Sequence, residues 1–182
     1  MTKRDSAEIV NHFARLFDSR GGEAYLGEAV SIAEHMLQAA AEASAAGGAE
    51  PLVAAALLHD NAYLTSKRVP DDNLYRHHAA IGAKYLSKYF SEDVCRPVSL
   101  HVAAKRYLCA VEPGYFDRLS PASLRTLNLQ GGAMSPDEAD KFATEDPAAV
   151  SLRRWDEAGK THGLAVPDFK HYRSLLESLA TC

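Results

Sequence analysis

Residues 51–58, Pro-Leu-Val-Ala-Ala-Ala-Leu-Leu, are apolar on every side, and the polar pair His59-Asp60 follows them directly. A helix that is hydrophobic all round lies in a protein core, not at its surface. This segment therefore carries an imidazole and a carboxylate into the interior of the fold. Burying a carboxylate without a compensating charge costs on the order of several kcal/mol. We therefore expect a positively charged partner beside Asp60.

The rest of the chain shows helical spacing of apolar residues almost throughout, as at Ile9, Phe13 and Phe17. The alternating β-branched pattern of strands is almost absent. Glycines and prolines divide the chain into segments of helical length, at residues 21–22, 47–48, 69–72, 113–114, 131–132 and 166–167. The pattern predicts an all-α fold, a helical bundle.

Some helix starts can be placed from local signals. Ser135-Pro136-Asp137-Glu138 combines a capping serine, a proline at the first helical position and acids in the first turn, so a helix is expected to begin there. A second helix is expected to open at His78, where the run His-Ala-Ala-Ile-Gly-Ala-Lys-Tyr-Leu starts.

Length and charge limit the function classes. A chain of 182 residues, 47% apolar and without repeats, is enough for one ordinary globular core, so we expect residues 1–182 to form a single domain. Lys and Arg number 20 against 24 Asp and Glu, a net charge of −4. This balance argues against a nucleic-acid partner, which requires a broad cationic face. The sequence does not indicate an oligomeric state.

Histidine is unusually frequent compared with cysteine, with eight His against three Cys. The cysteines are too few and too scattered for a disulfide framework or a Cys-rich zinc site, which fits a reduced compartment. The N-terminal segment is interrupted by His12, Arg15 and Asp18, so neither a secretory signal nor a membrane span is expected. We expect a cytoplasmic protein without a membrane partner.

Several polar residues lie where they can join His59-Asp60 at a metal site. His35, His78 and His101 each follow a helical pattern, and any one alone is more often a structural histidine. Asp156 borders the buried side marked by Leu152 and Trp155, although its spacing alone favours a solvated surface acid. Four histidines and two aspartates exceed the needs of one catalytic ion with an open position, and they fit two ions bridged by Asp60. Imidazole and carboxylate ligands suit iron, zinc, manganese or nickel.

The motif of His35, then His59-Asp60, then a later Asp156 resembles the HD-domain superfamily. Further motifs resemble one of its groups, the mixed-valent di-iron oxygenases that cleave the carbon–phosphorus bond of 1-hydroxyphosphonates, over almost the whole chain. They are Tyr25-Leu26-Gly27-Glu28, His78-Ala79-Ala80-Ile81-Gly82-Ala83, His101-Val102-Ala103-Ala104-Lys105-Arg106-Tyr107-Leu108, Ser120-Pro121-Ala122-Ser123-Leu124, Leu129-Gln130-Gly131-Gly132 and Leu152-Arg153-Arg154-Trp155-Asp156.

This resemblance implies a ligand set and a cofactor. His35, His59, Asp60 and Asp156 would hold one iron, and His78 and His101, with the bridging Asp60, the other. The pair would be Fe(II)/Fe(III), with O2 as co-substrate and a small hydroxyphosphonate as substrate. Tyr25 would cap one iron before the substrate arrives, and Glu28 would pair with Tyr25 in this gating.

Substrate-binding residues follow partly from the resemblance and partly from spacing. Lys105 lies four residues after His101 and therefore on the same helix face, where a phosphonate could lie between its ammonium and a metal. Ser123, Thr126 and Gln130 form one polar stripe that can donate hydrogen bonds to phosphonate oxygens, unless it is simply a solvated helix face. Arg153 shares a helix face with Asp156, three residues on, and is expected to help bind the phosphonate. The resemblance adds Asn61 and Tyr63 to the substrate site.

One position departs from the family pattern. The family commonly has His-Asp-Ile-Gly-His, whereas this chain has His59-Asp60-Asn61-Ala62-Tyr63, so tyrosine replaces a substrate-facing histidine. An aromatic face attracts a quaternary ammonium by ~0.5–2 kcal/mol without N–H donors on the ligand. The change favours (R)-1-hydroxy-2-(trimethylammonio)ethylphosphonate, cleaved to glycine betaine and phosphate, over 2-amino-1-hydroxyethylphosphonate, cleaved to glycine. Tyr63 packing without substrate contact remains the alternative.

Two other functions share part of these residues. A metal-dependent HD phosphohydrolase acting on a nucleotide would use His35, His59, Asp60 and Asp156, but it gives no reason for Tyr25-Leu26-Gly27-Glu28. A non-catalytic HD-like helical module would be expected to have lost ligands, and none of the six is missing from the sequence. Metal analysis with an EPR spectrum and O2 consumption would separate the three.

Overall fold

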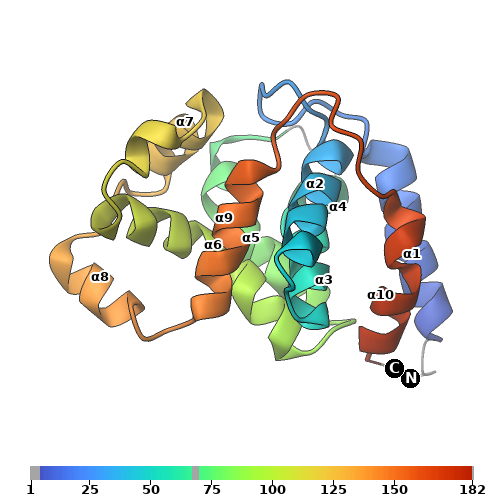
Figure 1. The fold of residues 1–182 in the computed structure, drawn as a ribbon. Coiled ribbons are helices and arrows are strands. Elements are labelled where there is room, and N and C mark those ends of the chain that lie inside the picture. Colours follow the sequence, from blue (N-terminus) through green and yellow to red (C-terminus); the bar gives the residue numbers. More distant parts are fainter. Residues whose placement is uncertain (1–4, 67–69, 182) are drawn as a thin grey trace.

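The structure is a computed structural model that describes residues 5–66 and 70–181. Over these ranges it confirms the all-α prediction (Figure 1), and it forms no strand, only isolated bridges between Ala24 and Ser31 and between Phe90 and Ala180. The α-helices are α1 (Ser6–Arg20), α2 (Ile32–Ala45), α3 (Glu50–Leu58), α4 (Asn61–Thr65), α5 (Asp72–Leu86), α6 (Glu92–Val111), α7 (Pro121–Leu129), α8 (Pro136–Phe142), α9 (Pro147–Ala158) and α10 (Arg173–Leu179), with short 3-10 helices η1 (Phe116–Arg118) and η2 (Phe169–Tyr172).

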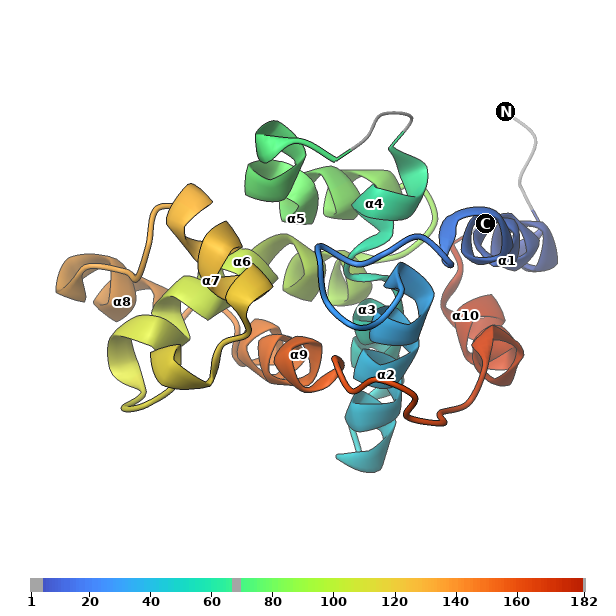
Figure 2. The same cartoon turned by 90° about the horizontal axis from the view of Figure 1, so that it is seen from above.

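The apolar helix α3 lies in the core, as expected from its sequence. Its residues from Val53 to Leu58 are buried, and it packs against α2, α6 and α9 (Figure 2). Pro51 lies in its first turn, where a missing N–H costs little. Because α3 ends at Leu58, His59 and Asp60 fall at the junction with α4, inside the bundle.

The other helices surround this centre. α1 and α10 pack together on one side, while α7 and α8 lie on the opposite side (Figure 1). Phe17 on α1 also contacts Phe169 of η2, with ring centroids 4.7 Å apart. A long α6 runs through the middle and contacts both α5 and α9. Every helix in the described ranges is too short or too polar to cross a bilayer.

The helix starts agree with the sequence in one case and differ in another. Ser135 caps α8 in a capping box with Glu138, as expected. The expectation that His78 opens a helix is wrong: α5 begins at Asp72, and the side chain of Asp71 accepts a hydrogen bond from the Leu74 amide. The cap Asp71 lies about two turns before His78, so His78 falls in the middle of α5.

Candidate active site

Four histidines are held in the same way. The Nδ1 atom of each donates to a backbone carbonyl, so its Nε2 atom is the one that faces the site. The carbonyl partners are Gly159 for His35 at 2.8 Å, Ala56 for His59 at 2.8 Å, Tyr75 for His78 at 3.0 Å and Val98 for His101 at 2.7 Å. All four side chains are buried, whereas His77, the neighbour of His78, is exposed.

These Nε2 atoms meet in two pairs. They lie 3.1 Å apart between His35 and His59, and 3.0 Å apart between His78 and His101. Two unprotonated Nε2 atoms at this distance repel each other unless a proton or a metal cation lies beside them. Two imidazole nitrogens bound to one ion at about 2.0–2.1 Å each lie about 3 Å apart, which matches both pairs.

Asp60 lies between the two pairs. Its Oδ2 atom is 3.7 Å from His35 and 3.6 Å from His59, and its Oδ1 atom is 3.5 Å from His78 and 3.9 Å from His101. Asp156 adds a second carboxylate to the first pair, with Oδ1 3.4 Å from His35 Nε2. The ligand atoms thus form two buried groups, each suited to an ion: His35, His59 and Asp156, and Asp60, His78 and His101.

Two orphaned oxygens support metal binding. Oδ1 of Asp60 and Oδ1 of Asp156 are buried without a hydrogen-bond partner. An unsatisfied buried acceptor on a charged group costs more than about 1–3 kcal/mol, and a metal ion would remove this cost. Asp156 is only 4% exposed, which overturns its interpretation as a solvated surface acid. The donor set therefore fits two metal ions bridged by Asp60.

The pKa values of the metal-free chain show which of these ligands are ready to bind a metal. Burial acts to raise the pKa of Asp60, but the surrounding histidines, His59 first, hold it at about 2. Burial lowers the pKa of His101 to about 3, so this imidazole is neutral. Asp60 and Asp156 outweigh burial at His59 and raise its pKa to about 9. Metal binding must therefore displace the proton of His59.

Tyr25 covers this centre from the loop before α2. Its hydroxyl donates to Oδ2 of Asp60 over 2.7 Å, and its ring stacks on His35 with centroids 4.0 Å apart. Burial, followed by the charge of Asp60, raises the pKa of Tyr25 well above its usual value. The loop turns sharply here, with Leu26 at φ 51° and Gly27 at φ 85°. A leucine in this left-handed region is strained, and such strain persists only where the surrounding structure holds the backbone in place.

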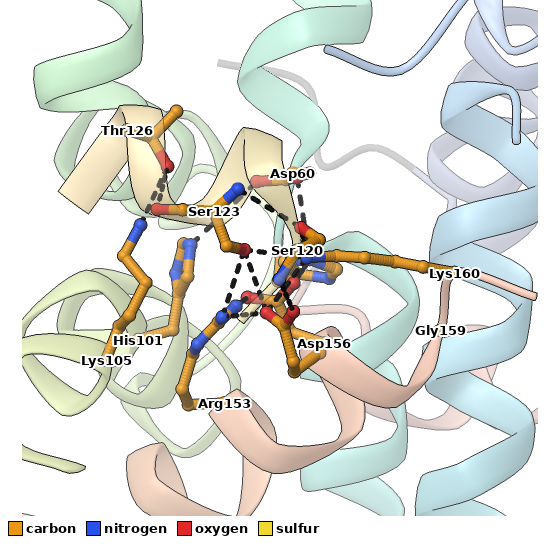
Figure 3. Close-up of polar contacts among 12 residues, drawn as sticks. Asp60, His101, Lys105, Ser120, Ser123, Thr126, Arg153, Asp156, Gly159 and Lys160 are labelled. Carbon is orange, nitrogen blue, oxygen red and sulfur yellow. Dashed lines mark hydrogen bonds and ion pairs between the residues drawn. The ribbon is translucent and has the colours of Figure 1, made fainter. Parts of the chain in front are cut away.

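A cavity of about 20 Å³ opens beside His78 and His101. Three cations line it, Lys105, Arg153 and Lys160, and they approach from different directions (Figure 3). The Lys105 ammonium donates to the Thr126 hydroxyl over 2.9 Å. The other lining residues are Tyr25, Leu26, Glu28, Tyr63, His78, His101, Val102, Ala122, Ser123, Thr126 and Asp156.

Two expected substrate residues do not line the cavity. The Gln130 amide donates over 2.8 Å to the Tyr75 carbonyl, the same oxygen that fixes His78. The Asn61 amide donates over 2.8 Å to the Leu58 carbonyl, and it packs so closely on Gly82 that a Cβ atom there would lie 2.9 Å from it. Both residues support the backbone around the histidines in this structure.

Tyr63 lies at the cavity but is tightly packed. Its ring stacks on the imidazole of His78 with centroids 5.3 Å apart and meets the ring of Tyr25 edge-on at 6.3 Å. Its buried hydroxyl has no hydrogen-bond partner. One face of the ring is therefore covered by His78, and contact with a ligand depends on the remaining surface.

Sequence reasoning missed Glu157 and Lys160. Glu157 accepts from the Ser120 amide at 2.9 Å and the Ser123 hydroxyl at 2.8 Å, and it pairs with Arg153, so it ties α7 to α9. Lys160 follows α9 and lines the cavity. The signal was present, because Asp156, Glu157 and Lys160 follow Arg153 at i+3, i+4 and i+7.

Comparisons with known proteins agree with this geometry. The HD-domain family model matches residues 32–143. The chain is 40% identical to a [1-hydroxy-2-(trimethylamino)ethyl]phosphonate dioxygenase (glycine-betaine-forming) of Leisingera caerulea, over 98% of this chain and 94% of the relative. It is also 40% identical to a hydroxymethylphosphonate dioxygenase of Gimesia maris, over 98% of this chain and 90% of the relative.

Proposed function

The chain belongs to the HD-domain family, and from this premise we propose that it is an oxygenase that cleaves the carbon–phosphorus bond of a 1-hydroxyphosphonate with O2. The observation that carries the proposal is Asp60, which offers one carboxylate oxygen to each of two histidine pairs beside a cavity lined by cations. The relatives named as phosphonate dioxygenases supply the reaction class.

The metals of the proposed enzyme are two iron ions. Histidine and carboxylate ligands suit iron, and a mixed-valent Fe(II)/Fe(III) pair would supply the activation of O2. His35, His59 and Asp156 would hold one ion, His78 and His101 the other, and Asp60 would bridge them. His59 must lose its proton to join the ligand set, because its pKa is about 9 in the metal-free chain.

The remaining site residues bind and orient the substrate. Lys105 and Arg153 present positive charge to the phosphonate, and the hydroxyls of Ser123 and Thr126 lie among them. Fixing the phosphonate at this end orients C1 and its hydroxyl toward the metal centre. A cavity of about 20 Å³ holds about one water, so Tyr25 must move from Asp60 before a substrate can enter.

The proposed substrate is (R)-1-hydroxy-2-(trimethylammonio)ethylphosphonate, and the products are glycine betaine and phosphate. Tyr63 supports this choice because an aromatic side chain at the cavity suits a quaternary ammonium, and the Leisingera caerulea relative is named for such a substrate. Glu28, a half-buried carboxylate at the cavity, adds a negative charge for the ammonium end.

A second candidate substrate is hydroxymethylphosphonate. The Gimesia maris relative carries the name of that activity at the same identity. In this case Tyr63 would fill the space that a trimethylammonium group occupies in the first proposal.

We also propose that residues 1–182 form one HD domain in a cytoplasmic enzyme. The family model ends at residue 143, yet Asp156 on α9 completes the first ligand group and α9 packs on α2 and α6. Cys95 and Cys109 are free thiols, which fits a reducing compartment.

A comparison of substrates tests the proposal. Iron-loaded protein would be assayed for phosphate release with the trimethylated, the primary-amine and the one-carbon hydroxyphosphonates, each as kcat/KM, with a nucleoside triphosphate as the comparison. We expect the trimethylated compound to give the highest value. Preference for the primary amine would overturn the role of Tyr63, and release from the nucleotide alone would indicate a phosphohydrolase.

A further inference from the structure

Lys160 lies at the cavity although it belongs to no helix. Its side chain is 9% exposed and extends from the end of α9 toward α7 (Figure 3). The preceding Gly159 fixes this position, because its carbonyl accepts from His35 Nδ1 and a Cβ atom on it would lie 2.9 Å from the His35 carbonyl oxygen. The backbone that orients a metal-site histidine therefore also places Lys160.

Lys160 and Arg153 reach one oxygen atom. The Oγ atom of Ser123 lies 2.7 Å from the Lys160 ammonium and 3.3 Å from Arg153 Nη2. Lys160 also donates to Ser120 over 3.1 Å. Two cations that approach one oxygen at the rim of a cavity are arranged to bind an oxyanion with several acceptor oxygens.

The carboxylates at this end of the cavity match its cations in number only if Asp156 is counted. Glu157 pairs with both Arg153 and Lys160, and Glu28 lies 3.8 Å from Lys160. Asp156 also pairs with Arg153, but it belongs to the first candidate metal group. Leaving that ligand aside, the two carboxylates Glu28 and Glu157 face three cations, including Lys105.

The cations also act on one another. Burial, followed by the charge of Arg153 and then that of Lys160, lowers the pKa of Lys105 to about 7. Lys105 and Lys160 both line the cavity, and their positive charges repel each other. An anion of charge −2 between them would relieve this repulsion.

We infer that Lys160 is a further substrate-binding residue, which together with Arg153 and Ser123 holds the phosphonate group. This inference rests on the proposed function, because it assigns the anionic group of that substrate. The alternative is a purely structural role, in which Lys160 only links Glu157 to α7. In that role its loss would lower stability without a selective effect on anion binding.

The test uses methylphosphonate, which has the anionic group and neither the hydroxyl nor the ammonium. Its affinity for iron-loaded protein would be measured by calorimetry under anaerobic conditions, so that no turnover occurs. Lys160→Gln keeps a donor for Ser120 and Ser123 but removes the charge, and we expect it to weaken binding about 10- to 100-fold, the usual effect of losing a charged hydrogen bond. Lys160→Arg should bind within about threefold of the wild type because it restores the charge.

Lys141 is an exposed lysine on α8, and Lys141→Met is the matched control. This variant should bind methylphosphonate as the wild type does. If Lys160→Gln does not fold, the methylphosphonate affinities of Lys160→Met and Lys160→Arg still show whether the charge at residue 160 is needed for binding. Unchanged affinity in the charge-removing variants, or no binding by the wild type, overturns the inference. If binding depends on Lys160 but no hydroxyphosphonate is turned over, the anion site stands and the proposed function fails.

Discussion

The hydroxyl of Tyr25 donates a hydrogen bond to Oδ2 of Asp60 across 2.7 Å, which ties the loop before α2 to the carboxylate that joins both histidine pairs. Since Asp60 is the common ligand of the proposed centre, a group bonded to it reports on both metals. Tyr25 also lines the cavity, and the strained backbone of Leu26 follows it directly. We propose that this contact breaks when the substrate enters.

Tyr25→Phe should therefore change the resting metal centre. Without the hydroxyl, Asp60 loses a donor, and we expect a shifted EPR or absorption spectrum in the substrate-free protein, with little change once substrate is bound. Tyr107→Phe, on α6 and away from the lining of the cavity, is the control. An unchanged resting spectrum in Tyr25→Phe would remove the assignment of Tyr25 as a lid.

Metal loading should stabilise the fold. Six buried ligands bind ions only in the native state, and an ion at 100 times its Kd adds about 2.7 kcal/mol to the free energy of unfolding. At about 2–4 °C per kcal/mol for a chain of this size, each ion should raise Tm by about 5–10 °C. Calorimetry of stripped and iron-loaded protein measures the shift.

The two adjacent histidines of α5 give this prediction a matched pair. His78→Asn should lose about half of the metal-induced shift, whereas His77→Asn should keep all of it, because His77 is exposed and His78 is buried. Equal shifts in both variants would contradict the second ligand group.

Phosphonate binding should weaken at alkaline pH. The pKa of Lys105 is lowered from its usual 10.5 to about 7, so above pH 7 the free protein loses the proton that the anion requires. The apparent Kd for methylphosphonate should therefore rise above pH 7, by up to about tenfold per pH unit. Lys105→Arg keeps its charge throughout this range and should flatten the profile. A wild-type profile that is equally flat would show that Lys105 does not contact the anion.

Tyr63 separates the two candidate substrates. Tyr63→Leu removes the aromatic face, so kcat/KM for the trimethylated substrate should fall about 2- to 30-fold, the equivalent of ~0.5–2 kcal/mol. Hydroxymethylphosphonate, which has no ammonium, should be affected much less. Tyr63→Phe should retain activity and stability, since the hydroxyl it removes has no partner. Equal losses for both substrates would mean that Tyr63 acts only by packing on His78.

The sequence was sufficient for the centre of the fold. An all-apolar helix ending in His59-Asp60 has few places to lie, so the burial of this pair could be predicted from residues 51–58. Asp156 was harder, because its spacing also fits a surface acid. Its burial depends on α9 packing against α2 and α6, which is a tertiary contact that no local pattern contains.

The substrate side was predictable only where helical spacing holds. Ser123 and Thr126 lie on α7 and reach the cavity, but α7 ends at Leu129, so Gln130 leaves the stripe and bonds to Tyr75. Lys160 shows the converse, because it keeps helical spacing from Arg153 although α9 ends at Ala158. Helical spacing therefore does not predict the position of a residue that lies beyond the end of its helix.

Phosphate release in air and under nitrogen tests the central claim most directly. Iron-loaded protein would be incubated with (R)-1-hydroxy-2-(trimethylammonio)ethylphosphonate while O2 uptake, phosphate and glycine betaine are followed together. The proposed function predicts O2 consumption, phosphate and glycine betaine in equal amounts, and no phosphate under nitrogen. Equal phosphate release with and without O2 would contradict an oxygenase and indicate a metal-dependent hydrolase instead.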